Sequence, residues 1–233
     1  MKAIIVAAGE GTRMRPLTND KPKQLVELQG KPLLDHILNS LPEEISALII
    51  VVGYKGDQIR TWYGVTHAGK PITYVEQTER KGTWHALSLC EPYIEKGEKF
   101  FYLYADDLHG REGLRECIAA SDKGCTMSVT EVEDPRRFGV VEIDETGKIT
   151  HAEEKPDLPR SHLVSTGAFV LTPEVFKYRP ALHKGEEYLF QSVAAMIQDG
   201  HAFYAVPSTF WFPIGYPEDV ARAEAEVRPE HLL

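Results

Sequence analysis

Residues 2–23 read KAIIVAAGEGTRMRPLTNDKPK. An apolar run of strand length ends in a glycine turn, a pattern typical of a buried parallel strand followed by a loop. Glycine lets the backbone approach a ligand closely, and exposed N–H groups in such a turn bind anions. Cationic groups that can bind phosphate follow at Arg13, Arg15, Lys21 and Lys23. The stretch therefore predicts a phosphate-binding loop, the alternative being an ordinary strand-to-helix turn with solvated charges.

The distribution of charge favours a small anionic ligand. The 233 residues carry a formal charge of −9, but residues 1–31 alone carry +3 and the other 202 carry −12. A nucleic-acid surface needs an extended basic face, whereas this chain predicts one basic loop on an acidic body. We therefore expect no nucleic-acid partner.

Length and composition predict one soluble domain with a substantial core. Hydrophobic residues make up 42% and charged residues 26% of the chain, which is ordinary for a globular protein. No apolar run approaches the ~20 residues of a membrane helix, so no membrane partner is expected. The N-terminal apolar run ends at a charged glycine loop rather than a cleavage site, which indicates a strand and not a signal peptide. Three cysteines without metal-type spacing indicate reduced thiols and a cytoplasmic location.

Strands and helices alternate in the first half of the chain. Strands are predicted at 2–6, 47–52, 72–76 and 100–104, and helices at about 33–41, 57–63, 83–90 and 111–121, with Thr83 as a helix cap. This βαβ rhythm predicts an α/β fold with a doubly wound, mainly parallel sheet.

The rhythm changes after Cys125. Short turns join predicted strands at 125–131, 139–143, 149–153 and 164–171, followed by helices at 174–178 and 188–199, a strand at 202–206 and a helix from Pro217. We expect both halves to share one mixed sheet and to form a single domain.

Two common phosphate motifs are excluded. Gly9-x-Gly11-x-x-Met14 lacks the third glycine of a dinucleotide fingerprint, and no Gly-Lys-Ser/Thr closes a P-loop. The stretch instead resembles the signature of the sugar-phosphate nucleotidyltransferases, or NDP-sugar pyrophosphorylases. That signature is a strand, Ala-Ala-Gly-x-Gly-Thr-Arg-Leu/Met-Arg-Pro-Leu-Thr, then Pro-Lys and Gly-Lys-Pro-Leu, the last present here at 30–33.

The resemblance covers nearly the whole chain and carries expectations about fold and activity. It implies a Rossmann-like nucleotidyltransferase domain over residues 1–233, without the C-terminal β-helix of some relatives. Residues 1–124 would bind the nucleotide and residues 125–233 the sugar phosphate. The implied reaction joins an NTP and a sugar 1-phosphate into an NDP-sugar and pyrophosphate, with Mg²⁺ as the cofactor. A homo-oligomer is left open.

Residue roles follow from the same resemblance. Asp106 comes at the end of a predicted central strand, where ligands of open α/β sheets collect and where a carboxylate can hold Mg²⁺. Asp107 is expected behind it. The predicted catalytic residues are Arg13, Lys23 and Asp106. The predicted nucleotide-binding residues are Ala8, Gly9, Gly11, Thr12, Gln77, Gly82 and Thr83. The predicted sugar-phosphate-binding residues are Gly139, Glu154, Lys155 and Thr166.

The sequence departs from the family pattern at two positions. Trp84 replaces a small residue. It either faces the base pocket, where it stacks on the base or narrows the pocket, or it belongs to the core. Pro213 stands where Trp-x-Asp-Ile-Gly-Thr-Pro-Glu-Asp has its second metal-ligand aspartate. Asp107 or Glu187 could substitute for that aspartate, or Asp106 could hold the metal with waters and phosphates. Because Arg13, Lys23, Asp106 and Lys155 remain, weakened but real catalysis is expected.

Two alternatives to this function remain. One is a cytidylyltransferase that acts on phosphocholine or a similar phosphomonoester, which would need an aromatic cage for the ammonium group. The other is a non-catalytic relative that binds a nucleotide or sugar nucleotide, which Pro213 motivates. No Ser/His/Asp or Cys/His arrangement stands out, as expected for a reaction that needs no general base.

Overall fold

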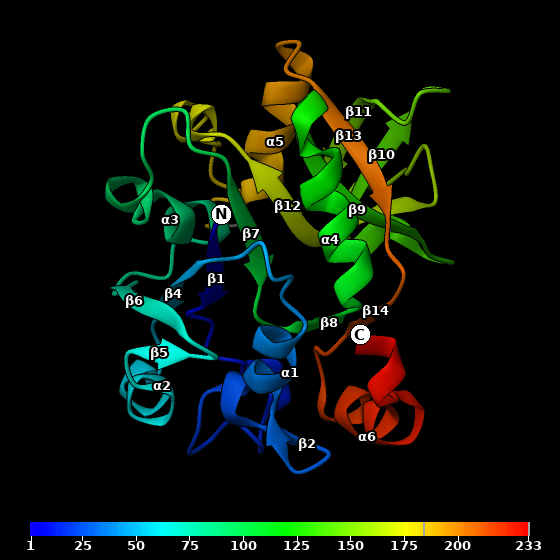
Figure 1. The fold of residues 1–233 in the computed structure, drawn as a ribbon. Coiled ribbons are helices and arrows are strands. Elements are labelled where there is room, and N and C mark those ends of the chain that lie inside the picture. Colours follow the sequence, from blue (N-terminus) through cyan, green and yellow to red (C-terminus); the bar gives the residue numbers. More distant parts are fainter. Residues whose placement is uncertain (184, 233) are drawn as a thin grey trace.

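The computed structural model describes residues 1–183 and 185–232. Over these residues the main element is a ten-stranded mixed sheet with helices against both faces (Figure 1). Its strands are β1 Lys2–Ala7, β4 Ala47–Val52, β5 Thr66–His67, β6 Lys70–Glu76, β7 Phe100–Tyr104, β9 Cys125–Glu131, β10 Gly139–Ile143, β11 Ile149–Glu154, β12 Leu163–Leu171 and β13 Phe203–Pro207. Two short ladders pair β2 Glu27–Leu28 with β3 Lys31–Pro32, and β8 Asp107–His109 with β14 Trp211–Pro213.

The helices are mostly short. The α-helices are α1 Leu33–Asn39, α2 Gly56–Tyr63, α3 Thr83–Ser88, α4 Arg111–Ala120, α5 Leu189–Gln198 and α6 Pro217–Glu226. The 3₁₀ turns are η1 Thr12–Met14, η2 Lys23–Leu25, η3 Glu91–Tyr93, η4 Ser121–Lys123, η5 Pro135–Arg137, η6 Pro173–Lys177 and η7 Pro229–Leu232. Among the described residues, no helix is both long enough and apolar enough to cross a lipid bilayer.

The strand order places a crevice beside β1. The order is β11-β10-β12-β7-β1-β4-β6-β5, with β9 joined to β12 and β13 joined to β9. β1 pairs in parallel with β4 on one side and with β7 on the other. The chain therefore winds in opposite directions from β1, and ligands of open α/β sheets bind where the strand order reverses in this way. The carboxyl ends of β1 and β7 meet there, because Ala105 N–H donates to the Val6 carbonyl at 3.1 Å.

Successive side chains of the central strands point to opposite faces of the sheet and contribute to two separate apolar cores. Ile5 belongs to the cluster that also contains apolar residues of α1, α2, α4 and α6, whereas Ile4 belongs to the cluster formed with α3 and α5. Both side chains are fully buried. Successive residues of a strand point to opposite faces of the sheet, so a continuous apolar run is required when both faces are covered. This is the physical reason for the sequence of β1.

The structure confirms the α/β fold and the mixed sheet, and it corrects two local predictions. Residues 173–177 form a 3₁₀ turn rather than an α-helix. Thr83 does not cap α3: Gly82 is the capping residue, and the Thr83 hydroxyl accepts a hydrogen bond from Leu189 N–H at 2.9 Å. The hydroxyl is thus used in a contact across the fold, which local sequence does not encode. The β8–β14 ladder is also unpredicted, because its strands lie far apart in the sequence.

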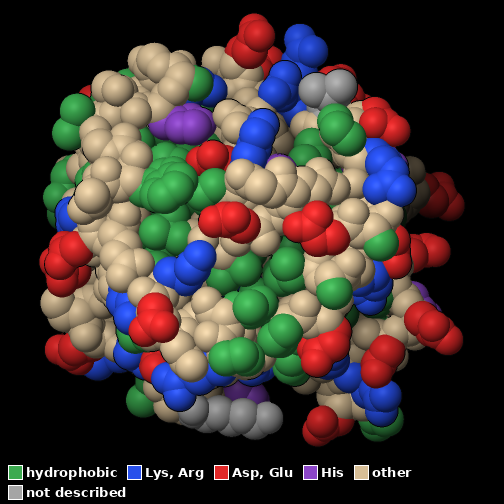
Figure 2. Space-filling model, turned by 90° about the horizontal axis from the view of Figure 1, so that it is seen from below, with side chains coloured by type: hydrophobic (Ala, Val, Ile, Leu, Met, Phe, Trp, Pro, Cys, Tyr) green, Lys and Arg blue, Asp and Glu red, His purple; other side chains and the backbone are tan. Residues whose placement is uncertain are grey.

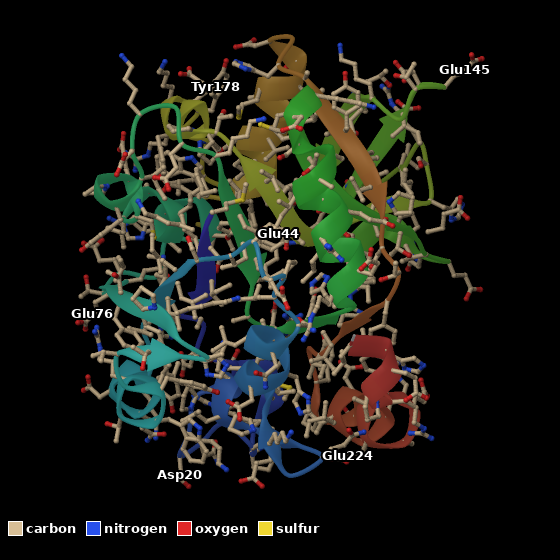
Figure 3. All side chains as sticks on the ribbon, viewed as in Figure 1. Asp20, Glu44, Glu76, Glu145, Tyr178 and Glu224 are labelled. Carbon is tan, nitrogen blue, oxygen red and sulfur yellow. The ribbon has the colours of Figure 1, made fainter. Side chains whose placement is uncertain are left out.

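The surface carries charges of both signs. On the face shown in Figure 2, acidic and basic side chains are interspersed, and the described residues of this face form no continuous basic patch. Figure 3 shows Asp20, which belongs to the basic N-terminal segment, and Glu145, which lies in the turn between β10 and β11, at opposite ends of the molecule.

Candidate active site

A cavity of about 360 Å³ opens where β1 and β7 end. Its lining comes from the loop after β1, the turn η2, the segment before α3 and the loop after β7. All ten residues that the sequence assigns to catalysis and nucleotide binding line it: Ala8, Gly9, Gly11, Thr12, Arg13, Lys23, Gln77, Gly82, Thr83 and Asp106. Residues up to about 100 positions apart in the sequence are therefore brought to one cavity of a size typical for small ligands.

The loop after β1 requires glycine at position 11. Its φ is +64°, and a Cβ atom there would lie 3.2 Å from the side chains of Lys23 and Thr18. The Thr18 hydroxyl also donates to the Gly11 carbonyl at 2.8 Å. Because only glycine adopts positive φ without steric cost, this residue lets the loop fold back closely onto Lys23.

Lys23 and Asp106 form an ion pair at the base of the cavity. The Lys23 Nζ atom lies 3.3 Å from Asp106 Oδ2. The lysine is 6% exposed, whereas the aspartate side chain is 44% exposed. A buried ammonium group needs a paired charge. The exposed carboxylate both supplies that charge and remains accessible from the cavity.

Asp107 is held differently from its neighbour. Its Oδ2 accepts a hydrogen bond from Trp211 Nε1 at 2.9 Å, and Pro213 lies opposite it in the β8–β14 ladder. Burial, together with the negative charge of Asp106, raises the pKa of Asp107 above its usual range. Asp107 and Pro213 are both absent from the cavity lining. Asp107 therefore lies behind Asp106, as the sequence predicts.

Gln77 and Gly82 form the opposite side of the cavity. The Gln77 Nε2 atom donates to the Gly82 carbonyl at 3.0 Å and lies 3.0 Å from His85 Nδ1. At Gly82, where φ is +97°, a Cβ atom would lie 2.4 Å from the Glu187 carbonyl oxygen. The backbone of Trp84 also donates to this carbonyl, at 2.9 Å. The segment before α3 is thus fastened to the segment before α5.

Trp84 belongs to the core. It is 7% exposed and packs in the apolar cluster of α3 and α5, and it is absent from the cavity lining. The Arg179 guanidinium carbon lies 5.7 Å from the centroid of its ring. Of the two interpretations of this departure from the family pattern, the structure supports packing.

None of the four predicted sugar-phosphate residues lines this cavity. Glu154 and Lys155 pair with each other at 3.0 Å, and the Lys155 Nζ atom lies 4.1 Å from the centroid of the Tyr188 ring. Lys155 has φ +47°. A non-glycine residue in this region is strained, and such residues often occur at functional sites.

Gly139 and Thr166 are packing positions. A Cβ atom on Gly139 would lie 2.6 Å from the Phe190 ring, and the buried Thr166 hydroxyl donates to the Ser128 carbonyl at 3.3 Å. Tyr104 lines the cavity, and burial together with the negative charge of Glu154 raises the pKa of its hydroxyl.

Glu10, Arg80 and Glu186 line the cavity but were not predicted. Glu10 accepts hydrogen bonds from Arg80 and, at 2.6 Å, from Arg15. Arg15 is thus paired with a carboxylate, whereas the sequence predicted it as one of several cations available to a phosphate. No sequence signal reveals this set, because Glu10 and Arg80 are 70 residues apart.

The structure shows whether another carboxylate can replace the metal-ligand aspartate that Pro213 displaces. Glu187 is buried and pairs with Arg179 at 2.6 Å, so it is not available to a metal. Within residues 1–183 and 185–232, no three His, Cys, Asp or Glu side chains are grouped as they would be in an all-protein metal site. Asp106 is the predicted ligand that remains at the cavity.

Together, these features define a class of protein. A glycine-rich, cationic loop and an accessible carboxylate lie at the switch point of an open α/β sheet. This combination is typical of a binding site for a phosphorylated ligand. Comparison with known proteins gives the family: residues 2–230 match the profile of the nucleotidyl transferase family. The chain belongs to that family.

Two relatives illustrate the similarity. The chain is 36% identical to the UTP–glucose-1-phosphate uridylyltransferase AglF of Haloferax volcanii, and the match covers 99% of this chain and 98% of that protein. Among solved structures, it is similar to a putative glucose-1-phosphate thymidylyltransferase from Bacillus anthracis, crystallised with a sucrose. The TM-score is 0.84 at 28% identity, over 98% of this chain and 96% of the other.

A third comparison shows the fold alone. The inositol-1-phosphate CTP transferase from T. maritima superimposes with a TM-score of 0.78 at 22% identity, over 97% of this chain and 96% of the other. Proteins named for different nucleotides therefore share this architecture.

Proposed function

We propose that this protein transfers a nucleotidyl group from an NTP to a sugar 1-phosphate, which releases pyrophosphate. The observation that carries the proposal is the convergence of all ten predicted catalytic and nucleotide-binding residues on one cavity, with the Lys23–Asp106 pair at its base. The names of two relatives, a uridylyltransferase and a thymidylyltransferase for glucose 1-phosphate, support the same substrate class.

The reaction requires that the sugar phosphate be aligned with the α-phosphorus of the NTP and that the charge on the leaving pyrophosphate be neutralised. A phosphate monoester has a second pKa near ~6, so a sugar 1-phosphate is already nucleophilic at neutral pH. One of its oxygens forms a bond to the α-phosphorus of the NTP, while the bond from that phosphorus to the bridging oxygen breaks and pyrophosphate leaves with the electron pair. In this proposal Arg13 and Lys23 stabilise the negative charge on the leaving group.

Mg²⁺ fits the residues that are present. Proteins commonly bind this ion through one or two carboxylates, with waters and substrate phosphates as further ligands. The exposed carboxylate of Asp106 at the cavity suits that arrangement. When bound, the ion would neutralise phosphate charge.

The second substrate is assigned to the other half of the chain. We expect residues 1–124 to bind the nucleotide and residues 125–233 the sugar phosphate. Lys155 would supply a positive charge to the phosphate, and Glu154 would accept hydrogen bonds from sugar hydroxyls. Gly139 and Thr166 would shape this region through the packing contacts described above. Tyr104 lines the cavity and its pKa is raised in part by the charge of Glu154, so we expect the two substrates to meet near this residue.

The test is pyrophosphate release across a matrix of NTPs and phosphomonoesters that includes glucose 1-phosphate, inositol 1-phosphate and phosphocholine. We expect release with at least one sugar 1-phosphate, and a loss of about 10²-fold or more in Lys23→Ala, because its ammonium group is preorganised for the leaving group. Lys21→Ala is the matched control, since Lys21 does not line the cavity. Release only with phosphocholine, or nucleotide binding without release from any pair, would support the two alternatives instead.

The setting of the protein is inferred from its thiols. Cys90, Cys117 and Cys125 are buried and unpaired, and burial raises the pKa values of Cys90 and Cys117 to about 12. Such thiols are unreactive, which fits the reducing cytoplasm predicted from the sequence. The open question of a homo-oligomer can be answered by light scattering on the full chain.

A further inference from the structure

Two arginines from distant segments share one aromatic ring. The guanidinium carbon of Arg13, in the loop after β1, lies 5.2 Å from the centroid of the Tyr216 ring. The guanidinium carbon of Arg137, at the end of η5, lies 5.6 Å from the same centroid. The Nη2 atom of Arg137 also donates to the Tyr216 hydroxyl at 3.3 Å. One residue thus holds a cation from each half of the chain.

Neither of these guanidinium groups has a carboxylate partner within 4.0 Å in the part of the chain that the structure describes. Other arginines near them do. Arg15 and Arg80 pair with Glu10, Arg136 pairs with Asp134, and Arg222 pairs with Asp219. Arg136 and Arg137 are neighbours on one turn, so the difference between them is not a matter of general exposure.

Hydrogen bonds to α6 hold the backbone that carries the Tyr216 ring. Tyr216 immediately precedes α6, and the Asp219 carboxylate accepts hydrogen bonds from the N–H groups of Gly215 and Tyr216, both at 2.9 Å. Gly215 and Arg13 both line the cavity, whereas Tyr216 and Arg137 lie next to these residues and outside its lining. In Figure 1, α6 lies beside the β8–β14 ladder, on the side to which the chain returns after β13.

An aromatic ring attracts each cation, but it does not neutralise either one. Two guanidinium groups near one ring therefore still repel each other, and an anion between them removes that repulsion. Their separation cannot exceed the sum of the two ring distances, a span that a diphosphate can bridge by accepting charge-assisted hydrogen bonds of about 2.8 Å from both. The cavity that Arg13 lines is where the proposed function puts the nucleotide phosphates.

We propose that Arg137, held beside Arg13 by Tyr216, is a second guanidinium ligand for the diphosphate end of the NTP, the part that leaves as pyrophosphate. Arg137 contacts the substrate in this proposal, and Tyr216 is a positioning residue that acts through both arginines. The inference rests on the proposed function. It adds a contribution from the second half of the chain to the binding of the first substrate.

The experiment uses the full chain with Mg²⁺ and measures kcat and KM for the NTP and for the sugar phosphate. It also measures the affinity for inorganic pyrophosphate by calorimetry. Arg137→Gln should raise the KM for the NTP and the Kd for pyrophosphate by about tenfold to a hundredfold, the usual effect of losing a hydrogen bond to a charged group. The KM for the sugar phosphate should change by less than about threefold. Arg136→Gln, on the same turn but paired with Asp134, should match the native protein.

The role of Tyr216 is tested with a variant that keeps the aromatic ring, a variant that removes it, and a double variant with Arg137→Gln. Tyr216→Phe keeps the ring and should stay within about threefold of the native values, whereas Tyr216→Leu should lose at least as much as Arg137→Gln because it releases both guanidinium groups. In the Tyr216→Leu background, Arg137→Gln should then have little further effect, since contacting residues are not additive. Thermal unfolding shows that each variant is folded.

The outcomes separate the inference from the proposed function. If the native protein neither turns over nor binds pyrophosphate, the proposed function fails. If it turns over and Arg137→Gln behaves like Arg136→Gln, or if the Arg137 and Tyr216→Leu effects simply add, this inference alone is overturned. A rise confined to the KM for the sugar phosphate would also overturn it, because it would assign Arg137 to the other substrate.

Discussion

Pro213 leaves the end of β14 without a carboxylate. It lies opposite Asp107 in the β8–β14 ladder, next to the strand end that carries Asp106. We predict that Pro213→Asp lowers the Mg²⁺ concentration needed for half-maximal pyrophosphate release, because a further carboxylate near Asp106 strengthens binding of a divalent cation. Mg²⁺ should also raise the Tm of this variant more than that of the native protein. Pro213→Asn, which removes the proline ring without adding charge, is the control. If neither quantity changes, the family's metal geometry does not apply here.

His109 is a buried residue whose effect depends on pH. It is 1% exposed, and neither ring nitrogen has a hydrogen-bond partner within the described residues. Burial lowers the pKa of His109 to about 3, while the negative charge of Asp106 acts in the opposite direction. Between pH 3 and the ordinary value near 6.5, the unfolded chain binds a proton that the folded protein does not. The contribution of His109 to stability is therefore complete above pH 6.5 and declines as the pH falls.

We predict that the free energy of unfolding, native minus His109→Leu, falls by about 2 kcal/mol between pH 7.5 and pH 5.0. The difference between the two proteins cancels the titration of other groups. Urea unfolding at both pH values measures it, and His162→Gln, which replaces an exposed histidine, should show a much smaller change. A difference that does not vary with pH would show that His109 binds its proton equally well in the folded and unfolded states, and so has an unshifted pKa.

At the level of elements, α3 and α5 are joined at their N-termini. Trp84 N–H donates to the Glu187 carbonyl, Glu187 N–H donates to the Lys81 carbonyl at 2.7 Å, and Leu189 N–H donates to the Thr83 hydroxyl. Gly82 lies at the centre of these contacts with almost no room for a Cβ atom. The segment that carries Gln77 and Thr83 into the cavity therefore takes its position from the second half of the chain.

Gly82→Ala should consequently destabilise the protein by about 3 kcal/mol or more, because it adds both backbone strain and a clash with the Glu187 backbone. It should also weaken nucleotide binding. Gly97→Ala is the matched control: its φ of +82° is similar, but a Cβ atom there meets nothing within 4 Å, so it should cost only about 1–2 kcal/mol. Chemical denaturation gives both values, and equal losses in the two variants would contradict the packing argument.

At the level of the whole molecule, the two halves share their cores. β7 of the first half pairs with β12 of the second, and both apolar clusters contain residues from each half. Neither half can unfold without exposing a long sheet edge and part of both cores. This continuity favours cooperative unfolding of the entire chain.

We therefore predict one urea transition, with coincident midpoints for separate reporters. Trp211→Phe leaves Trp62 and Trp84 as fluorophores in the first half, and the double variant Trp62→Phe/Trp84→Phe leaves Trp211 in the second. In each variant the fluorescence midpoint should equal its own far-UV circular dichroism midpoint. Separate midpoints in either variant would show that the halves unfold independently.

Much of the fold could be predicted from local patterns. The bounds of β4, β7, β9 and β10 agree with those expected from apolar residues and flanking turns. In β4 and β7 the pattern is a continuous apolar run, because a strand covered on both faces must be apolar throughout. The grouping of ten predicted residues around one cavity could be expected for a related reason. These residues follow directly after strands or precede helices, and the carboxyl ends of parallel strands meet at one edge.

The positions of the residues proposed to bind the sugar phosphate were harder to predict. The register of β12 against β9 shifts between Ser165 and Phe169, which resets the alternation that decides whether a side chain faces a core or a ligand. Thr166 lies within that shift and is buried against Ser128. A sequence motif identifies such a residue but does not give its direction.

The sequence alone determined that this chain forms an α/β sheet with a cationic glycine loop at the end of its first strand, since those features depend on residues that are neighbours along the chain. Only the tertiary structure decided which charges remain available to a ligand. It pairs Arg15 with Glu10, places Lys23 beside Asp106, and brings Arg13 and Arg137 to the ring of Tyr216. These contacts join residues up to 203 positions apart in the sequence, and they exist because the strand order brings their elements together.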